Sequence, residues 1–251
     1  MSATDKSVYP ILGKAPIILA ILQIQFRLKK DINNKTFSNL ASVREKYPII
    51  NETNSAQFQI NPQDSKTPIS LKHFQNDGYS YTTKDGSKSF TISKTTFTYQ
   101  MRPPYVSWED FSSEALSIWR QCGIEENIQV IIRQSIRYVN AFEIKEGKNT
   151  IEPSDYFNSY LVVSPKYPDY SRYMFQYTIP LEGYETIAHI GTEIRESLNS
   201  IFPFIFDLDV ISLKAMDYDN IKLKDTFNKL RLYKNSIFFN SLKERTINLF
   251  I

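Results

Sequence analysis

Residues 79–93 read YSYTTKDGSKSFTIS, and this stretch carries the clearest fold signal in the chain. Aromatic, β-branched and hydroxyl residues lie on both sides of Asp85 and Gly86. Such segments are typical of strands, and an Asp-Gly pair readily adopts the positive φ angles of a tight turn. The stretch therefore predicts a β-hairpin, which a further strand over residues 95–101 extends into an antiparallel meander.

Further strands and helices can be placed on both sides of this hairpin. Apolar runs and alternation predict strands at residues 16–27, 57–60, 130–142, 172–181 and 204–214. Apolar residues at three- and four-residue spacing predict helices near 37–47, over 108–122 between a Ser107 cap and a Gly123 stop, over 186–198, and from about 225 to the C-terminus. Together these elements predict an α+β fold of long, mainly antiparallel strands packed with a few amphipathic helices.

The order of elements is similar in two parts of the chain. We expect an N-terminal α+β half over residues 1–147 and a C-terminal α+β half over residues 148–251, which ends in a basic, aromatic helix. The two halves could derive from a degenerate duplication, although no repeat is visible at the level of residues. A chain of 251 residues is also compatible with one continuous domain, and that alternative stays open.

The composition is that of a globular protein rich in pleated surface. Hydrophobic residues make up 41% of the chain and charged residues 23%, which excludes a disordered chain. Aromatic residues reach 14% against only 7 glycines, a balance that favours strands. The formal charge of +3 is too small to indicate nucleic-acid binding on its own.

Cysteine usage and the absence of long apolar runs indicate a cytoplasmic protein. Cys122 is the single cysteine, so neither an intramolecular disulfide nor a zinc site of several thiolates can form. The first ten residues lack a basic run followed by an apolar segment, and no apolar stretch approaches the roughly 20 residues of a membrane span. We therefore expect neither secretion nor contact with a membrane.

No catalytic residue and no cofactor can be assigned from the sequence. The two histidines are His73, in an expected loop, and His189, on the helix expected over 186–198, and neither lies in a motif. A nucleophile needs a base placed beside it by a third group, and no phosphate-binding glycine loop is present. The sequence favours a protein that is not an enzyme, without excluding an enzyme.

Two aspartates form the best candidate for a metal site. Asp207 and Asp209 are two residues apart on an expected strand, so their side chains share one face. A hard cation such as Mg²⁺ prefers paired carboxylates. The alternative is that Leu208 and Val210 face the core while the two acids face water.

Two arginines on the 130–142 strand are candidates for binding a partner. Arg133 and Arg137 lie on alternate positions of one face, whereas Ile132, Ile136 and Tyr138 lie on the other. Two guanidinium groups could clamp a phosphate, a carboxylate or an acidic partner. The alternative is a cross-strand ion pair with acids on a neighbouring strand.

The last helix is a second candidate surface. Basic residues alternate there with aromatic ones, and the candidates for partner contact are Lys224, Arg231 and Phe239. Such a surface could bind the backbone and bases of a nucleic acid. The same residues are also expected of an amphipathic helix packed on a sheet.

Four short motifs in order resemble a known family. They are Lys14-Ala15-Pro16-Ile17, the Tyr81–Ser93 hairpin, the Trp108–Phe111 helix start and Arg137-Tyr138-Val139-Asn140. This set is similar to that of a sporadically distributed bacterial family of uncharacterised proteins of roughly this length. Leu19 stands where the family has Glu, which puts any role of that Glu in doubt here. The resemblance implies an accessory protein that works beside a neighbouring gene product, as in mobile-element and phage-defence clusters.

We therefore expect a non-catalytic binding or adaptor protein of a bacterial defence-type or mobile-element system, with a protein partner. One alternative is a Mg²⁺-dependent nucleic-acid binding or processing protein that uses Asp207 and Asp209. Another is a small-ligand sensor with an aromatic-lined cavity. Homo-oligomer formation and nucleic-acid binding both stay open.

Overall fold

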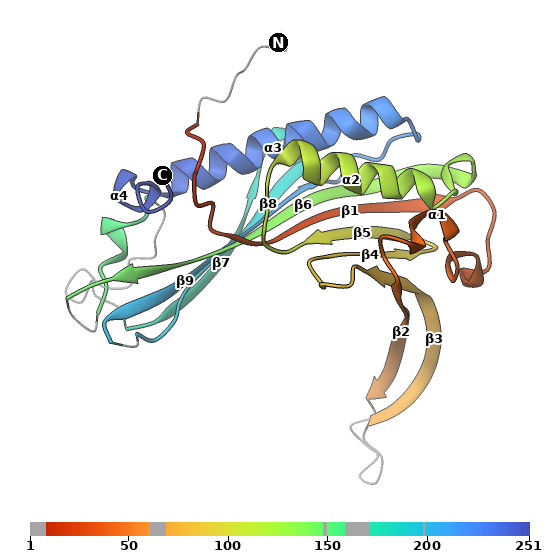
Figure 1. Ribbon diagram of the computed structural model, residues 1–251, viewed down its shortest axis with the longest axis horizontal. Coiled ribbons are helices and arrows are strands. Elements are labelled where there is room, and N and C mark those ends of the chain that lie inside the picture. Colours follow the sequence, from red (N-terminus) through yellow and green to blue (C-terminus); the bar gives the residue numbers. More distant parts are fainter. Residues whose placement is uncertain (1–8, 61–68, 148–149, 159–170, 198) are drawn as a thin grey trace. The chain divides into compact units, whose positions relative to one another are not determined.

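The computed structural model describes residues 9–60, 69–147, 150–158, 171–197 and 199–251 (Figure 1). Within these ranges the strands are β1 Ile17–Leu28, β2 Ile49–Ile60, β3 Ile69–Thr82, β4 Lys88–Ser93, β5 Thr96–Met101, β6 Ile128–Lys145, β7 Tyr173–Pro180, β8 Thr186–Ile194 and β9 Ile201–Ser212. The α-helices are α1 Ala41–Arg44, α2 Trp108–Gln121, α3 Asn220–Ser241 and α4 Glu244–Ile247. Short 3-10 turns are η1 Asn34–Phe37, η2 Glu125–Asn127, η3 Pro153–Asp155 and η4 Glu182–Tyr184.

The predicted fold class is confirmed, because long strands pair in antiparallel fashion and helices accompany them. The chain divides into two compact units that interleave along the sequence. The first unit comprises Met1–Ile21, Gln134–Lys214 and Asn220–Ile251. The second comprises Leu22–Arg133 and Ala215–Asp219. The division at residue 147 and the duplication stay predictions.

In the first unit the strands run in the order β6-β9-β8-β7, and α3 packs on β9 (Figure 1). The side of β9 that packs against the core consists of alternate, fully buried residues: Phe202, Phe204, Phe206, Leu208 and Val210. Phe206 contacts Phe238 of α3 at a ring-centroid distance of 5.9 Å. Because side chains alternate along a strand, the residues between them lie on the opposite side. We call that side of β6, β9, β8 and β7 the open face.

The prediction of a helix over residues 186–198 is wrong, since this segment contains strand β8, Thr186–Ile194. Thr186, Ala188, Ile190, Thr192 and Ile194 are buried in strict alternation. Branched residues at these positions suit a pleated surface, and pairing with both β7 and β9 satisfies the backbone of the strand. His189 accordingly lies on a strand and not on a helix.

In the second unit the strands run in the order β2-β3-β4-β5-β1. Trp119 of α2 packs its ring against Phe26 of β1 and Phe97 of β5, at 5.2 and 5.4 Å between centroids. Figure 1 shows the β2–β3 pair extending beyond β4. The strand expected over residues 57–60 exists but begins at Ile49. His73 lies in β3 and not in a loop, and its side chain is outside the described part of the chain.

The helix start and stop signals around α2 are confirmed. The Ser107 hydroxyl accepts a hydrogen bond of 3.0 Å from the backbone N–H of Asp110, which is the expected cap. Gly123 has a φ of +67°, the left-handed conformation that ends helices. The buried stripe of this helix includes Phe111, Ala115 and Ile118. Local chemistry therefore defines both ends of α2.

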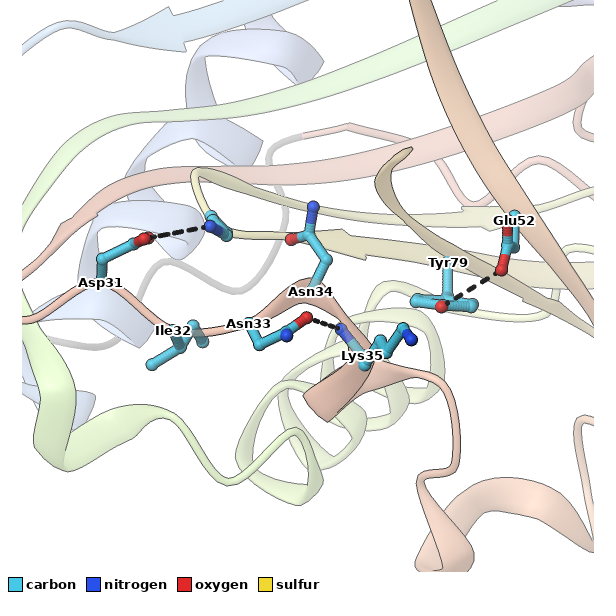
Figure 2. A pocket seen from close by; sticks show the side chains of 8 residues that line it. Asp31, Ile32, Asn33, Asn34, Lys35, Glu52 and Tyr79 are labelled. Atoms are coloured by element: carbon cyan, nitrogen blue, oxygen red, sulfur yellow. Dashed lines mark hydrogen bonds and ion pairs between the residues drawn. The ribbon is translucent and has the colours of Figure 1, made fainter. Parts of the chain in front are cut away.

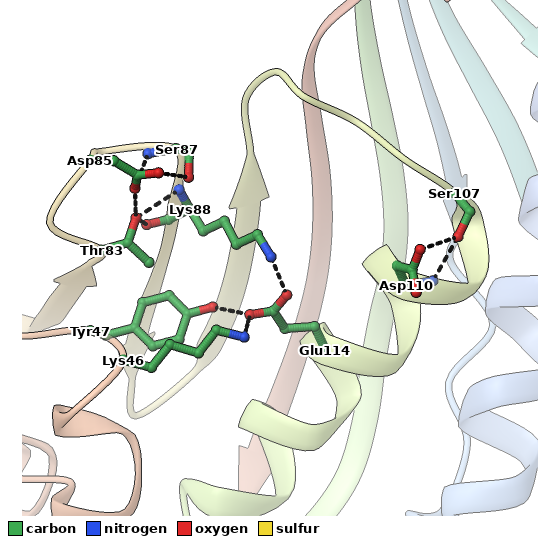
Figure 3. A network of polar contacts seen from close by, with 9 residues as sticks. All are labelled: Lys46, Tyr47, Thr83, Asp85, Ser87, Lys88, Ser107, Asp110 and Glu114. Atoms are coloured by element: carbon green, nitrogen blue, oxygen red, sulfur yellow. Dashed lines mark hydrogen bonds and ion pairs between the residues drawn. The ribbon is translucent and has the colours of Figure 1, made fainter. Parts of the chain in front are cut away.

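The hairpin between β3 and β4 is also confirmed, with a longer loop than an Asp-Gly turn requires. Among the described residues of the loop, only Gly86 has a positive φ, at +70°. The Asp85 carboxylate accepts hydrogen bonds from the Thr83 hydroxyl at 2.6 Å and the Ser87 N–H at 3.1 Å (Figure 3). Asp85 thus organises the loop through its side chain while Gly86 supplies the left-handed residue.

A polar network joins α2 to its neighbours in the second unit (Figure 3). The Glu114 carboxylate accepts a hydrogen bond of 2.7 Å from the Tyr47 hydroxyl and one of 2.6 Å from Lys88 Nζ. Lys46 forms an ion pair with the same carboxylate. Burial raises the pKa of Glu114, but these hydrogen bonds outweigh burial and hold its pKa at about 2. Glu114 is therefore ionised at neutral pH and ties α2 to β4 and to the segment after α1.

Two further sequence expectations are refined by the structure. The helix near residues 37–47 consists of turn η1 followed by the one-turn helix α1. On β6, Ile136 and Tyr138 are buried as expected, but Ile132 is 38% exposed while Ile131 is fully buried. The alternation therefore slips before Gln134, which is buried at 1% exposure. In the ranges that the structure describes, no helix has the length and apolar character of a membrane span.

Candidate functional site

Polar side chains from four strands meet in the middle of the open face. The register of the strands aligns them in two adjacent cross-strand rows. The first row consists of Arg137, Asp209, His189 and Thr178. The second row consists of Val139, Asp207, Gly191 and Gln176. Directly opposed residues have Cβ atoms about 5 Å apart, so each row is a continuous line of neighbouring groups.

Arg137 and Asp207 form the strongest contact in these rows. Arg137 Nε donates a hydrogen bond of 2.8 Å to Asp207 Oδ1, and Nη2 donates a second one to Oδ2. The hydrogen bond to Asp207 raises the pKa of Arg137, and the charge of Asp209 adds to this effect. The side chain of Arg137 is still 46% exposed. The guanidinium is therefore held in one orientation while it remains accessible.

His189 and Thr178 form a second pair in the first row. Thr178 Oγ1 and His189 Nδ1 are 2.6 Å apart, and both residues are exposed. In a Ser-His-Asp triad the carboxylate binds Nδ1 and the nucleophilic hydroxyl lies at Nε2. Here the hydroxyl lies at Nδ1, although Asp209 is the cross-strand neighbour of His189. The geometry differs from that of an activated nucleophile.

The rows on either side of this polar centre are richer in apolar groups. One contains Ala141, Ile205 and Met174 beside Glu193. Met174 is 67% exposed. The other includes Ile187, which faces Ile211 across the strands. Ile211 is buried and Ile187 is half-buried, so the exposed apolar surface beside the hydrogen-bonding groups lies mainly in the row of Met174.

The structure brings together three residues singled out in the sequence, Arg137, Asp207 and Asp209. Leu208 and Val210 are fully buried, as expected, and the two aspartates share the open face. Within the described ranges, no group of three or more His, Cys, Asp or Glu side chains is arranged to hold a metal ion. A metal-binding role of the aspartates stays a prediction.

The other candidate residues lie elsewhere. Arg133 belongs to the second unit, where its Nη1 donates a hydrogen bond of 2.6 Å to Gln23 Oε1. On α3, Lys224 is exposed and Arg231 is half-buried. Phe239 stacks on Tyr9 at 4.7 Å between ring centroids, so part of its ring is covered by the chain itself.

Sequence reasoning missed three members of the two rows, Thr178, Gln176 and Gly191. The first two occupy alternate, exposed positions of β7. This alternation was a readable signal of a polar strand face. Gly191 could not be noticed, because the segment around it was expected to be a helix.

A hollow of about 560 Å³ lies in the second unit (Figure 2). Lys94 pairs there with Asp31 at 2.9 Å, and the Tyr79 hydroxyl donates a hydrogen bond of 3.3 Å to Glu52. Asn33 caps turn η1 by accepting a hydrogen bond of 2.9 Å from the N–H of Lys35. These contacts pair the polar groups of the hollow with one another, so the open face remains the better candidate site.

Comparison with known proteins adds no assignment. No protein-family model matches this chain, and no curated protein matches it. The resemblance to a bacterial family therefore stays a prediction. The function has to be argued from the residues of the site.

Proposed function

We propose that this protein is a non-catalytic binding protein that recognises a protein partner through the open face of the first unit. The observation that carries the proposal is the first row, in which polar groups from four strands lie side by side, with Arg137, His189 and Thr178 exposed. β9 and β8 are each paired with a strand on both sides and form a rigid platform for such groups, whereas β7 is the edge strand. Arg137, fixed by Asp207, is the proposed central contact.

The make-up of the face favours a protein over other partners. Arginine and methionine are enriched at protein interfaces, and both are present here as Arg137 and Met174. Apolar groups beside a hydrogen-bonding centre suit a surface that is covered on binding. The arrangement of Thr178 and His189 favours recognition over nucleophilic catalysis.

The open face is also a better candidate than α3. On the helix, Lys229 already forms an ion pair with Glu182, and Phe239 stacks on Tyr9. Of the three candidate residues on α3, Lys224 is the exposed charged one, since Arg231 is half-buried and Phe239 is uncharged. Both surfaces can be compared directly, because each offers an exposed basic residue for substitution.

The first partner to test is the product of a neighbouring gene, as the family resemblance implies. Both proteins would be co-expressed and co-purified, and their affinity measured by calorimetry. Arg137→Ala should weaken binding by at least about tenfold, because a central arginine typically contributes more than 1.4 kcal/mol to an interface. His189→Ala should weaken binding less, because the imidazole offers fewer hydrogen bonds than a guanidinium.

Lys224→Ala on α3 is the matched control and should leave the affinity unchanged. The opposite pattern, in which Lys224→Ala weakens binding and Arg137→Ala does not, would move the interface to α3 and refute the proposal. Absence of any complex with neighbouring gene products would also count against it. The fold of each variant is checked by circular dichroism.

A further inference from the structure

A hollow of about 340 Å³ opens on the open face above Gly191. A Cβ atom added to Gly191 would lie 3.6 Å from the Cβ of Asp207 and 3.7 Å from the Cγ of Gln176. These are ordinary contact distances, so a Cβ atom fits at this position without a clash. The backbone of Gly191 therefore forms part of the floor of the hollow and leaves room there for at least a Cβ atom.

The backbone does not require glycine at this position. Gly191 lies inside β8 and is not among the residues with positive φ. Glycine inside a strand lowers stability relative to alanine. Such a glycine often marks a site where a ligand or another chain approaches closely. Gly191 thus lowers the stability of β8 at a position where the strand borders a hollow between polar groups.

The charges around the hollow favour a cation. Asp207 and Asp209 border it beside Arg137, so two carboxylates face one guanidinium, and the imidazole of His189 also lines the hollow. Both oxygens of Asp207 already accept hydrogen bonds from Arg137. A carboxylate or phosphate entering the hollow would meet two acids, whereas an ammonium or guanidinium would reduce the net charge.

The far side of the hollow adds further hydrogen-bonding groups. Thr178 and Gln176 line it from β7, and His189 lines it from β8. The volume is at the lower end of the roughly 300–1,000 Å³ that small-molecule sites occupy. It suits one extended side chain better than a nucleotide.

We propose that the hollow above Gly191 receives a lysine or arginine side chain of the protein partner. This inference rests on the proposed function and specifies the chemistry of its partner. The cationic end lies near Asp209, and the alkyl part of the side chain passes over the backbone of Gly191. Thr178 and Gln176 supply hydrogen-bond acceptors from the opposite wall.

The probes are Nα-acetyl-L-arginine methylamide and Nα-acetyl-L-lysine methylamide. Their binding to the full chain is measured from the backbone amide signals in NMR spectra. We expect saturable shifts of the Gly191 amide that weaken as salt is added. Asp209→Asn should weaken the binding of either probe by at least about fivefold. Gly191→Val should abolish the shifts, since valine fills the hollow and suits a strand.

Asp155→Asn is the matched control, because Asp155 is exposed and lies outside the hollow in the same unit. It should leave probe binding unchanged. The inference is overturned if neither cationic probe binds, or if Nα-acetyl-L-glutamate methylamide binds equally well. If neither cation binds but Arg137→Ala still removes the protein partner, the inference falls and the proposed function stands. If the probes bind but Arg137→Ala leaves the affinity for the partner unchanged, the proposed function falls, and the hollow is a cation site that the partner does not use.

Discussion

Lys234 is a lysine whose surroundings disfavour its charge. Its ammonium lies 4.4 Å from the ring centroid of Tyr138, beneath α3 and against the sheet of the first unit. Burial lowers the pKa of Lys234 to about 7, and the nearby charge of Arg231 adds to this effect. The ring face of Tyr138 compensates part of the cost, because it attracts a cation.

Replacing Lys234 should make the protein more stable, and the gain should depend on pH. The pKa of Lys234 falls from 10.5 to about 7 on folding, so the unfolded state holds more protons between these values. Stability should therefore rise with pH across this window, and the full cost is present below its lower end. Lys234→Met should raise the melting temperature by about 3–6 °C at pH 6 and by less at pH 10.

Lys224→Met provides the control for this experiment, since Lys224 is an exposed lysine on the same helix. The melting temperatures of the wild type, Lys234→Met and Lys224→Met, measured by calorimetry at pH 6 and pH 10, check the prediction. An equal shift for Lys234→Met at both pH values would show that the charge of Lys234 costs nothing on folding.

Glu114 shows the opposite linkage, because its carboxylate is stabilised in the charged form. Its pKa falls from 4.5 to about 2 on folding, so its contribution is complete above the higher value and is lost as pH falls through the lower one. Glu114→Gln should lower the melting temperature by about 2–5 °C at pH 7, with a smaller difference at pH 3. Glu185→Gln, at an exposed ion pair with Lys214, should change nothing. A difference between wild type and Glu114→Gln that does not shrink with acid would contradict the assigned role.

At the scale of elements, α2 and β8 show how differently local signals perform. The ends of α2 are specified by a cap and a glycine, both within one turn of the helix. In β8, strand pairing on both edges decides the conformation, and those partners lie far away in the sequence or across a turn. Local propensity is decisive only where no such pairing competes with it.

Ser107→Ala should destabilise α2 by removing its N-cap. The side chain of Ser107 satisfies the N–H of Asp110, so its loss should cost about 1 kcal/mol and lower the melting temperature by about 2–4 °C. Ser113→Ala, at an exposed position inside the same helix, is the matched control and should be neutral or slightly stabilising. Urea denaturation of both variants measures the difference. Equal midpoints for the two variants would mean that the cap contributes nothing.

At the scale of the whole molecule, the two compact units each contain segments distant in sequence. The first unit joins β6 to β9 and β8, so residues some seventy positions apart become neighbours, as Arg137 and Asp207 do. The sequence predicts that both residues lie on strand faces, and a cross-strand ion pair is one of the two roles expected for Arg137. It could not identify which strand would supply the acid, because strand order depends on how the core is buried.

Alternation and turn chemistry were enough to specify the α+β class, the hairpin before β4 and the limits of α2, since these signals act between residues a few positions apart. Packing alone decided that residues 186–194 form a strand, because their buried side chains meet a core built from distant segments. That strand brings His189 and Gly191 between Asp209, Asp207 and β7. The candidate site exists only once strand register has been set, and register is chosen by the burial of one whole face of the sheet.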